Sequence, residues 1–294
     1  MSLLLRLMSG LPLWFIHAVG AFLGWLTWWL SPSYRAHFHD QVRQAGVPWS
    51  RARPAVAEAG KMIAELPRLW LRPVEQALGA SVRWEGREVM AQALAARRGV
   101  LFLTPHLGSF EVAAQAYAEY FGKQYGPVTV LFRPARKAWM RAIVDQSRAR
   151  PGVATAPATL AGVRQMLRVL RKGGAVGLLP DQVPPLGQGV WAPFFGRPAY
   201  TMTLAARLMQ QTGAVAVLVW GERLALGRGF VVHVRAGPHI NPETTPESAA
   251  TLINQAMEQL ILDLPSQYLW GYHRYKQPRG QASAPSADAQ KSEA

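Results

Sequence analysis

One short apolar run constrains the fold of this chain more than any other stretch. Residues 100–103 follow a glycine, carry only large apolar side chains, and are too few to form a helix. Such a run predicts a strand that is buried on both faces, as the strands of parallel sheets are. Helix-like segments separate most of the other predicted strands, which occupy residues 81–85, 127–132, 175–179, 214–220 and 230–235. The alternation predicts an α/β fold with a mixed, largely parallel central sheet flanked by helices.

Apolar side chains recur at helical spacing after residue 160. Leu160, Val163, Leu167 and Leu170 are three or four residues apart, so we expect them to form the buried stripe of an amphipathic helix. The basic residues of this helix form either a docking surface or an ordinary solvated face. Further helices are predicted at residues 88–97, 112–121, 201–212 and 251–264.

The segment from Val183 to Pro198 is rich in proline and glycine and predicts a long loop. Its aromatic residues are Trp191, Phe194 and Phe195. We expect them to line a groove for an apolar ligand, to contact lipid, or to form a small core within the loop.

A histidine lies three residues after the predicted strand at residues 100–103. His106 lies at the carboxyl end of that strand, which is where open α/β sheets bind ligands. Ser109 is the expected N-cap of the next helix, so Glu111 falls in the first turn, where a carboxylate is favoured. A histidine held by a carboxylate is a general base, and here the substrate would have to supply the attacking oxygen. The alternative is a histidine that merely caps the turn between strand and helix.

Charged residues also follow two other predicted strands, Arg133 after one and Asp181 after another. At the carboxyl edge of a sheet a guanidinium can bind a phosphate or an oxyanion, whereas elsewhere it is a solvated surface charge. Asp181 either holds an arginine, orients a substrate, or simply forms a turn. Near the end of the chain, Arg274 and Lys276 are candidates for contacting a phosphate.

Twenty residues without a charged side chain extend from Leu11 to Leu30. As a helix this run would be about 30 Å long, which is the thickness of the hydrocarbon core of a bilayer. It ends in Trp-Trp-Leu, unlike a signal peptide, and arginines are more frequent after it than before it. These features predict a membrane helix with the rest of the chain on the cytoplasmic side. The alternatives are a helix that lies on the membrane or is buried in the protein.

The composition excludes several kinds of site. The chain has no cysteine, so it has no disulfide, no thiolate nucleophile and no cysteine-bound zinc. His37, His39 and Asp40 lack a second cluster at a suitable spacing, so no metal site is predicted. The net charge of +15 predicts an anionic partner. Residues 133–172 hold ten basic residues and one acidic residue, so we expect much of the positive field to lie near His106.

Six sequence blocks occur in a characteristic order. The first is a His-x4-Glu motif, formed by His106 and Glu111 in the stretch HLGSFE. The others are Arg133-Pro134, Arg148, Pro180-Asp181-Gln182, the segment from Phe194 to Thr201, and residues 253–276. Together they resemble the bacterial lipid A late acyltransferases, a family of the lysophospholipid-acyltransferase-like superfamily. The chain departs from the family pattern at Phe110, where many relatives have tryptophan, and at residues 273–276, where the usual His-Arg-Arg-Phe-Lys is His-Arg-Tyr-Lys.

The resemblance implies transfer of a fatty acyl group from an acyl carrier protein thioester to a hydroxyl of a lipid A precursor. His106 would take the proton of the hydroxyl as its oxygen attacks the acyl carbonyl, and Glu111 would fix the imidazole ring. Backbone N–H groups near Gly108 or an arginine would stabilise the oxyanion. Substrate binding or transition-state support is implied for Arg133, Arg148, Asp181 and Arg274. No metal or other cofactor is required, because a thiol is a good leaving group.

The same resemblance implies an anionic lipid acceptor and a location at the bacterial inner membrane, with the catalytic domain on the cytoplasmic face. We expect a membrane anchor helix in residues 1–31, a catalytic domain in residues 32–280 and a disordered tail in residues 281–294. The open alternatives are a phospholipid or another glycolipid as acceptor, and a non-enzymatic basic protein that binds membranes. Nucleic acid is not an expected partner, because the chain contains no motif that binds it.

Overall fold

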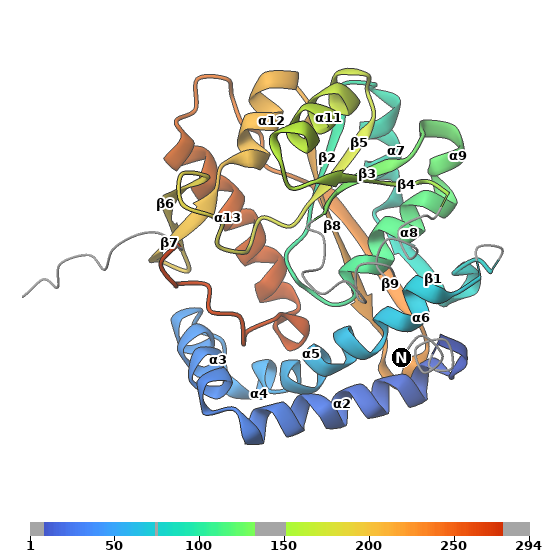
Figure 1. Ribbon diagram of the computed structural model, residues 1–294, viewed down its shortest axis with the longest axis vertical. Helices are drawn as coiled ribbons and strands as arrows, with labels where there is room; N and C mark the ends of the chain where they lie inside the picture. Colours follow the sequence, from blue (N-terminus) through green and yellow to red (C-terminus); the bar gives the residue numbers. More distant parts are fainter. Residues whose placement is uncertain (1–8, 74–75, 133–150, 279–294) are drawn as a thin grey trace, which may run out of the picture.

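The computed structural model describes residues 9–73, 76–132 and 151–278, and a seven-stranded sheet forms its centre (Figure 1). The strand order is β1-β9-β8-β2-β5-β3-β4. Neighbouring strands are parallel except β8 and β9, which are antiparallel, so the prediction of a mixed, largely parallel sheet is confirmed. The strands are β1 (Val82–Glu85), β2 (Val100–Leu103), β3 (Val128–Phe132), β4 (Val153–Pro157), β5 (Ala175–Leu178), β8 (Val215–Arg223) and β9 (Phe230–Ala236).

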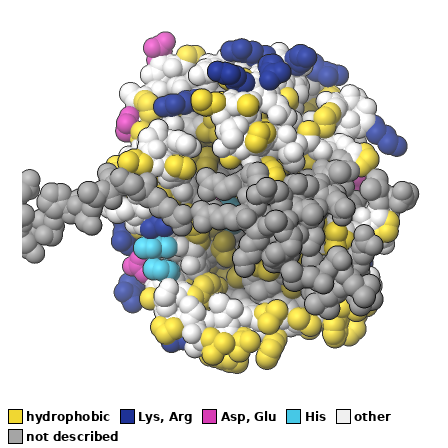
Figure 2. Space-filling model, in the orientation of Figure 1, with side chains coloured by type: hydrophobic (Ala, Val, Ile, Leu, Met, Phe, Trp, Pro, Cys, Tyr) yellow, Lys and Arg dark blue, Asp and Glu magenta, His cyan; other side chains and the backbone are white. Residues whose placement is uncertain are grey.

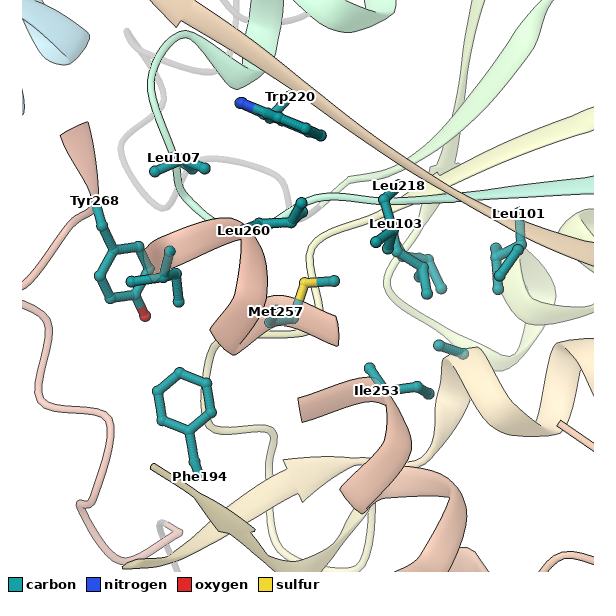
Figure 3. Close-up of a cluster of buried hydrophobic side chains, with 14 of the residues drawn as sticks. Leu101, Leu103, Leu107, Phe194, Leu218, Trp220, Ile253, Met257, Leu260 and Tyr268 are labelled. Atoms are coloured by element: carbon teal, nitrogen blue, oxygen red, sulfur yellow. The ribbon is translucent and has the colours of Figure 1, made fainter. Parts of the chain in front are cut away.

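The central strand β2 is buried on both faces, as predicted. Leu101 and Leu103 belong to one apolar core, and Val100 and Phe102 belong to a second core on the other face of the sheet. Figure 3 shows the first of these cores, where the two leucines of β2 lie near side chains of helix α13 (Pro246–Asp263). The alternation follows from the two-residue repeat of a strand.

Helices cover both faces of the sheet in the described part of the chain (Figure 1). Helices α11 (Leu160–Arg171) and α13 pack on the first core, and α7 (Arg87–Ala95) and α8 (Phe110–Tyr120) pack on the second. The other described helices are α2 (Leu13–Leu30), α3 (Pro32–Gln44), α4 (Trp49–Ala52), α5 (Ala55–Ala64), α6 (Leu66–Leu71), α9 (Gly122–Tyr125) and α12 (Leu204–Thr212), together with the short 3-10 helices η1 (Gly79–Ser81), η2 (Ala225–Gly227) and η3 (Pro265–Gln267).

The segment predicted to be a long loop contains a β-hairpin, so that prediction is wrong for its second half. Strand β6 (Gly189–Phe194) pairs antiparallel with β7 (Arg197–Met202), and α12 therefore begins later than expected. Phe195 and Gly196 form the turn with φ values of 48° and 74°, as a two-residue hairpin turn requires. Pro193 lies opposite Pro198, one pair beyond the turn, where antiparallel strands do not exchange N–H bonds. Proline is therefore tolerated in both strands.

The aromatic residues of this hairpin have different surroundings. Phe194 is buried in the first core, and the Tyr275 hydroxyl donates to its carbonyl at 2.9 Å. Trp191 remains 38% exposed. Phe194 therefore packs in the main core of the protein, which none of the three sequence alternatives described, and Trp191 stays partly exposed.

One residue of the predicted buried stripe on α11 is exposed. Met166 and Leu170 are buried and Val163 and Leu167 pack against the first core, but Leu160 is 77% exposed. The reason is Gly162, where a Cβ atom would lie 1.8 Å from the carbonyl oxygen of Pro157. The helix therefore approaches β4 at Gly162, and Leu160, two positions earlier, points about 200° away around the helix axis.

Helix α2 packs along α5 at one end of the molecule (Figure 1). Gly20 and Gly24 of α2 meet the backbone of α5 at Gly60. A Cβ atom would lie 2.3 Å from the carbonyl oxygen of Val56 if added at Gly24, and 2.0 Å from the carbonyl oxygen of Gly20 if added at Gly60. In the described residues α2 is the one helix long and apolar enough to cross a membrane, and 28% of it is buried against the protein.

Candidate functional site

His106 lies in the loop that leaves the carboxyl end of β2. Two isolated bridges fix this loop, one between Leu107 and Tyr268 and one between Gly108 and Gly221. Gly108 has a φ of 58°, and a Cβ atom there would lie 2.0 Å from the carbonyl oxygen of Gly221. Only glycine therefore lets the loop approach β8 so closely.

Asp181 lies beside His106 because β2 and β5 are adjacent parallel strands whose carboxyl ends meet at one edge. The backbone N–H of His106 donates to Oδ2 of Asp181 at 2.8 Å, and Nδ1 of the imidazole ring lies 2.7 Å from Oδ1. The Asp181 side chain is only 3% exposed, and that of His106 is 16% exposed. One carboxylate therefore holds both the backbone and the ring of the histidine. We call this edge of the sheet the catalytic edge.

Asp181 is ionised, which sets the tautomer of the ring. Burial alone raises the pKa of Asp181, but His106 and, as a further contribution, Arg274 outweigh burial and hold that pKa below its usual value. An ionised carboxylate only accepts, so Nδ1 carries the proton and donates. The side-chain nitrogen of Gln182 lies 3.1 Å from Nε2 and donates to it. The lone pair of Nε2 is thus the basic position of the site.

Asp181 therefore contributes the carboxylate that contacts Nδ1 of His106. The sequence alone left three roles open for Asp181. Glu111 lies in the first turn of α8, as predicted, and Ser109 is the N-cap of that helix without a side-chain capping bond. The pairing of Glu111 with His106 stays a prediction. The role of Gln182 was missed, although the Pro-Asp-Gln block contained it.

Arg274 does not contact phosphate from solvent, because its side chain is fully buried. Its guanidinium donates to the carbonyl of Tyr200 and to Oγ1 of Thr201, both at the end of β7, and lies 5.0 Å from the ring centre of Phe194. Direct contact of Arg274 with a phosphate is therefore not supported: the residue fastens the hairpin and adds positive charge behind Asp181. Its role in transition-state support stays a prediction. The candidates Arg133 and Arg148 lie outside the described residues.

The predicted oxyanion donors next to His106 are already engaged. The N–H of Gly108 donates to the carbonyl of Gln267 at 3.0 Å, and that of Ser109 donates to the carbonyl of Gly221 at 2.7 Å. These bonds hold the loop and leave neither group for an oxyanion. Among the described residues, no group of three or more His, Asp or Glu side chains forms a metal site.

Two basic residues at the end of α11 lie away from the site. Arg171 and Lys172 precede β5 and so lie at the amino ends of the parallel strands, opposite the catalytic edge. Figure 2 shows Lys and Arg side chains gathered at the end of the molecule where α11 and α12 lie. For Arg171 and Lys172, the expectation that the basic block lies near His106 is therefore wrong. The part of the block in residues 133–150 lies outside the residues that the structure describes.

An apolar cavity begins beside the catalytic edge. It is lined there by Thr104, Phe110 and Leu179, which neighbour His106 and Asp181 in the sequence. The lining continues to Val128 at the amino end of β3, and to Tyr117, whose hydroxyl donates to the carbonyl of Gly126. The cavity therefore extends between α8 and the sheet from the side of Phe110, whose ring centre lies 5.2 Å from that of His106. Glu111 also lines it.

The fold and the site together define a class of protein: a mixed α/β domain that holds a histidine–aspartate pair at the edge of its sheet, close to an apolar cavity. The comparison with known proteins then identifies the family. Residues 49–277 match the family described as bacterial lipid A biosynthesis acyltransferase, and the chain belongs to that family. The resemblance inferred from the sequence blocks is confirmed.

Similar curated proteins carry related names. The chain is 27% identical over 205 residues to the lipid A biosynthesis palmitoleoyltransferase of Escherichia coli (strain K12), which covers 68% of this chain and 63% of that protein. It is 26% identical over 203 residues to the lipid A biosynthesis lauroyltransferase of the same strain, covering 67% and 64%. It is 25% identical over 185 residues to the lipid A biosynthesis acyltransferase of Haemophilus influenzae, covering 63% and 56%. The matches thus span less than two thirds of each relative.

Proposed function

We propose that this protein transfers a fatty acyl group to a hydroxyl of a lipid A precursor. The observation that carries the proposal is the 2.7 Å contact between Nδ1 of His106 and Asp181, close to an apolar cavity whose lining residue Phe110 has its ring centre 5.2 Å from that of His106. Family membership and the names of the relatives support the same reaction. A non-enzymatic membrane-binding protein would have no use for a carboxylate-held base beside such a cavity.

The acyl donor in this proposal is a thioester of acyl carrier protein. Nε2 of His106 takes the proton of the acceptor hydroxyl as its oxygen forms a bond to the acyl carbonyl carbon. The carbon–sulfur bond then breaks, and the departing thiolate receives the proton from the imidazolium. Asp181 stabilises the imidazolium between these two transfers. The thiol is a good leaving group, so the residues of this chain need only to orient, to hold a proton and to exclude water.

The direction of substrate approach follows from Gln182. Its amide donates to Nε2 at 3.1 Å, which is the position that an acceptor hydroxyl must reach. Gln182 therefore moves aside or shares this position when the hydroxyl binds. The acyl chain would extend from there along the cavity between α8 and the sheet.

Glu111 has a different place in this proposal from the one in the sequence motif. It lies in the first turn of α8 and lines the cavity next to Phe110, whose ring centre is 5.2 Å from that of His106. We infer that Glu111 supports the base or the acceptor from the cavity side, while Asp181 holds Nδ1. The two carboxylates thus have separable roles.

The acceptor, the donor and the cellular location can be tested together. The purified protein is incubated with membranes, a lipid A precursor and acyl carrier protein thioesters of several chain lengths. The masses of all lipids are then measured. We expect acylated precursor with the unaltered protein, none with His106→Ala, and normal amounts with the control His239→Ala. His239 lies in the exposed segment after β9. Acylated phospholipid in place of acylated precursor would change the acceptor, and full activity of His106→Ala would refute the base.

The proposed location is the cytoplasmic face of the bacterial inner membrane. It is supported by the apolar helix α2, by the arginines that follow it in the sequence, which suit the anionic cytoplasmic leaflet, and by the proposed lipid acceptor. Fractionation of cells that produce the full chain, with protease added from either side of inner-membrane vesicles, tests it. Digestion from the periplasmic side alone would contradict this orientation.

A further inference from the structure

Helix α2 has two apolar faces, and only one of them is covered. Ile16, His17, Gly20 and Gly24 are buried against the protein. The helix contains no charged Asp, Glu, Lys or Arg side chain. Large apolar side chains on its outer face are between 36% and 73% exposed, and they are Trp14, Phe15, Val19, Phe22, Leu23, Trp29 and Leu30. An uncovered apolar face of this extent marks a contact with another apolar phase.

The hairpin between β8 and β9 adds a further apolar side chain beside this face. Leu226 is 84% exposed and adopts a φ of 58°, which is unfavourable for a branched residue. The turn that carries it touches the start of α2, since a Cβ atom at Gly227 would lie 2.3 Å from the backbone nitrogen of Trp14. We call the outer face of α2 together with Leu226 the α2 surface. Figure 2 shows hydrophobic side chains along the end of the molecule where α2 lies.

The inner face of α2 is fastened by buried ionic contacts as well as by glycine. Nε2 of His17 lies 3.1 Å from Glu65, and Glu65 receives two hydrogen bonds of 2.8 Å from Arg223. A second carboxylate, Glu58, contacts Arg223 at 2.7 Å. If α2 left the protein to cross a bilayer, His17 would enter the hydrocarbon and Glu65 would lose a partner. These contacts therefore favour a helix that stays on the body of the protein.

The surroundings of the α2 surface are cationic. Residues 31–73 contain seven Lys and Arg and three Asp and Glu, and two of the acids, Glu58 and Glu65, are paired with Arg223. Arg35 donates to the carbonyls of Trp28 and Trp29 at the end of α2. Tryptophans at both ends of the helix and arginines around it match the headgroup region of an anionic bilayer.

We propose that α2 lies flat in the membrane interface, with the α2 surface immersed in lipid, and does not cross the bilayer. The inference rests on the proposed function, from which it takes the lipid acceptor. It adds the orientation of the protein relative to the membrane. A path of contacts links α2 to the loop of His106: His17 to Glu65, Glu65 to Arg223, and Gln267 to both Arg223 and Gly108. This path holds the catalytic edge at a fixed height above the lipid.

Depth measurements with a fluorophore test this orientation. The chain has no cysteine, so Phe15→Cys, Phe22→Cys and Trp29→Cys each give a single labelling site on the outer face. These positions span about 21 Å along the helix axis. The labelled full-length proteins are mixed with vesicles of phosphatidylcholine and phosphatidylglycerol that carry nitroxide quenchers at a shallow or a deep position.

A flat helix predicts the same shallow depth for all three labels. A spanning helix predicts that the label at position 22 lies near the bilayer centre and that the other two lie near opposite interfaces, and this pattern would overturn the proposal. Absence of quenching at every position would also overturn it, because the α2 surface would then not contact lipid.

A second experiment separates this proposal from the proposed function. Phe22→Asp combined with Leu226→Asp should weaken vesicle binding roughly tenfold or more, because two exposed apolar contacts are lost. Leu160→Asp, on the exposed side of α11, is the matched control and should bind as the unaltered protein does. Acyl transfer to a detergent-dispersed acceptor should remain in both variants. Unchanged vesicle binding by the double variant refutes the surface, whereas inactivity of the unaltered protein on the dispersed acceptor refutes the function alone.

Discussion

Replacing Asp181 with asparagine tests which carboxylate holds the base. The side chain keeps its size but loses its charge and one of its two acceptor oxygens. Those oxygens now accept from the His106 backbone N–H at 2.8 Å and from the ring at 2.7 Å. The two bonds reach different oxygens, and an amide has an acceptor oxygen at only one of these two positions. Either one buried hydrogen bond is lost, or the amide donates to Nδ1 and the proton moves to Nε2, where it blocks the base.

The size of the loss follows from these contacts. A hydrogen bond to a charged group contributes about 1.5–3 kcal/mol, which corresponds to roughly a 10-fold to 150-fold change in rate. Loss of the general base through the wrong tautomer costs about 10²–10⁴-fold. We therefore expect Asp181→Asn to lower kcat by about 10²–10⁴-fold. KM for the lipid should change little, because Asp181 is buried behind the ring.

The assay is the initial rate of precursor acylation, measured by mass, with circular dichroism to confirm folding. Asp263→Asn is the matched control, because Asp263 is 42% exposed and pairs with Arg235 on the surface. Glu111→Gln is measured in parallel. Near-normal kcat in Asp181→Asn together with complete loss in Glu111→Gln would refute the assignment of Asp181 as the residue that holds the ring.

Three further predictions concern the cavity and the packing of α2. Gly177→Ala, whose Cβ would meet Val130 at 3.2 Å in the cavity wall, should shift the preferred acyl donor to shorter chains in a competition between thioesters. Gly24→Ala should lower the free energy of unfolding in urea by about 1–3 kcal/mol, because its Cβ meets backbone, whereas Gly10→Ala, which meets nothing within 4 Å, should change it by less than about 0.5 kcal/mol. Burial raises the pKa of Glu65, but Arg223 outweighs burial and lowers it from 4.5 to about 2. This pair should contribute about 3 kcal/mol above pH 4.5 and lose it as the pH falls through 2, and Glu65→Gln should remove that part of the pH dependence.

The sequence by itself determined the class of fold and the position of His106 in it. Short apolar runs without alternation must be buried on both faces, so β2 and its neighbours could be assigned from local pattern alone. A residue that follows such a strand lies at the edge where parallel strands end, which located both His106 and Asp181. Turn chemistry predicted the start of α8 at Ser109. The ordered sequence blocks were sufficient to indicate the family.

The tertiary structure decided which of these residues meet. Asp181 reaches His106 because β5 pairs with β2, and strand order depends on contacts between residues 75 positions apart that no local pattern records. The same reason explains Arg274, whose basic side chain is indistinguishable from a surface charge until Thr201 and the rest of the hairpin bury it. Hydropathy likewise shows that α2 is apolar throughout. Only the packing of its glycines on α5 shows that one of its faces is covered and the other is not.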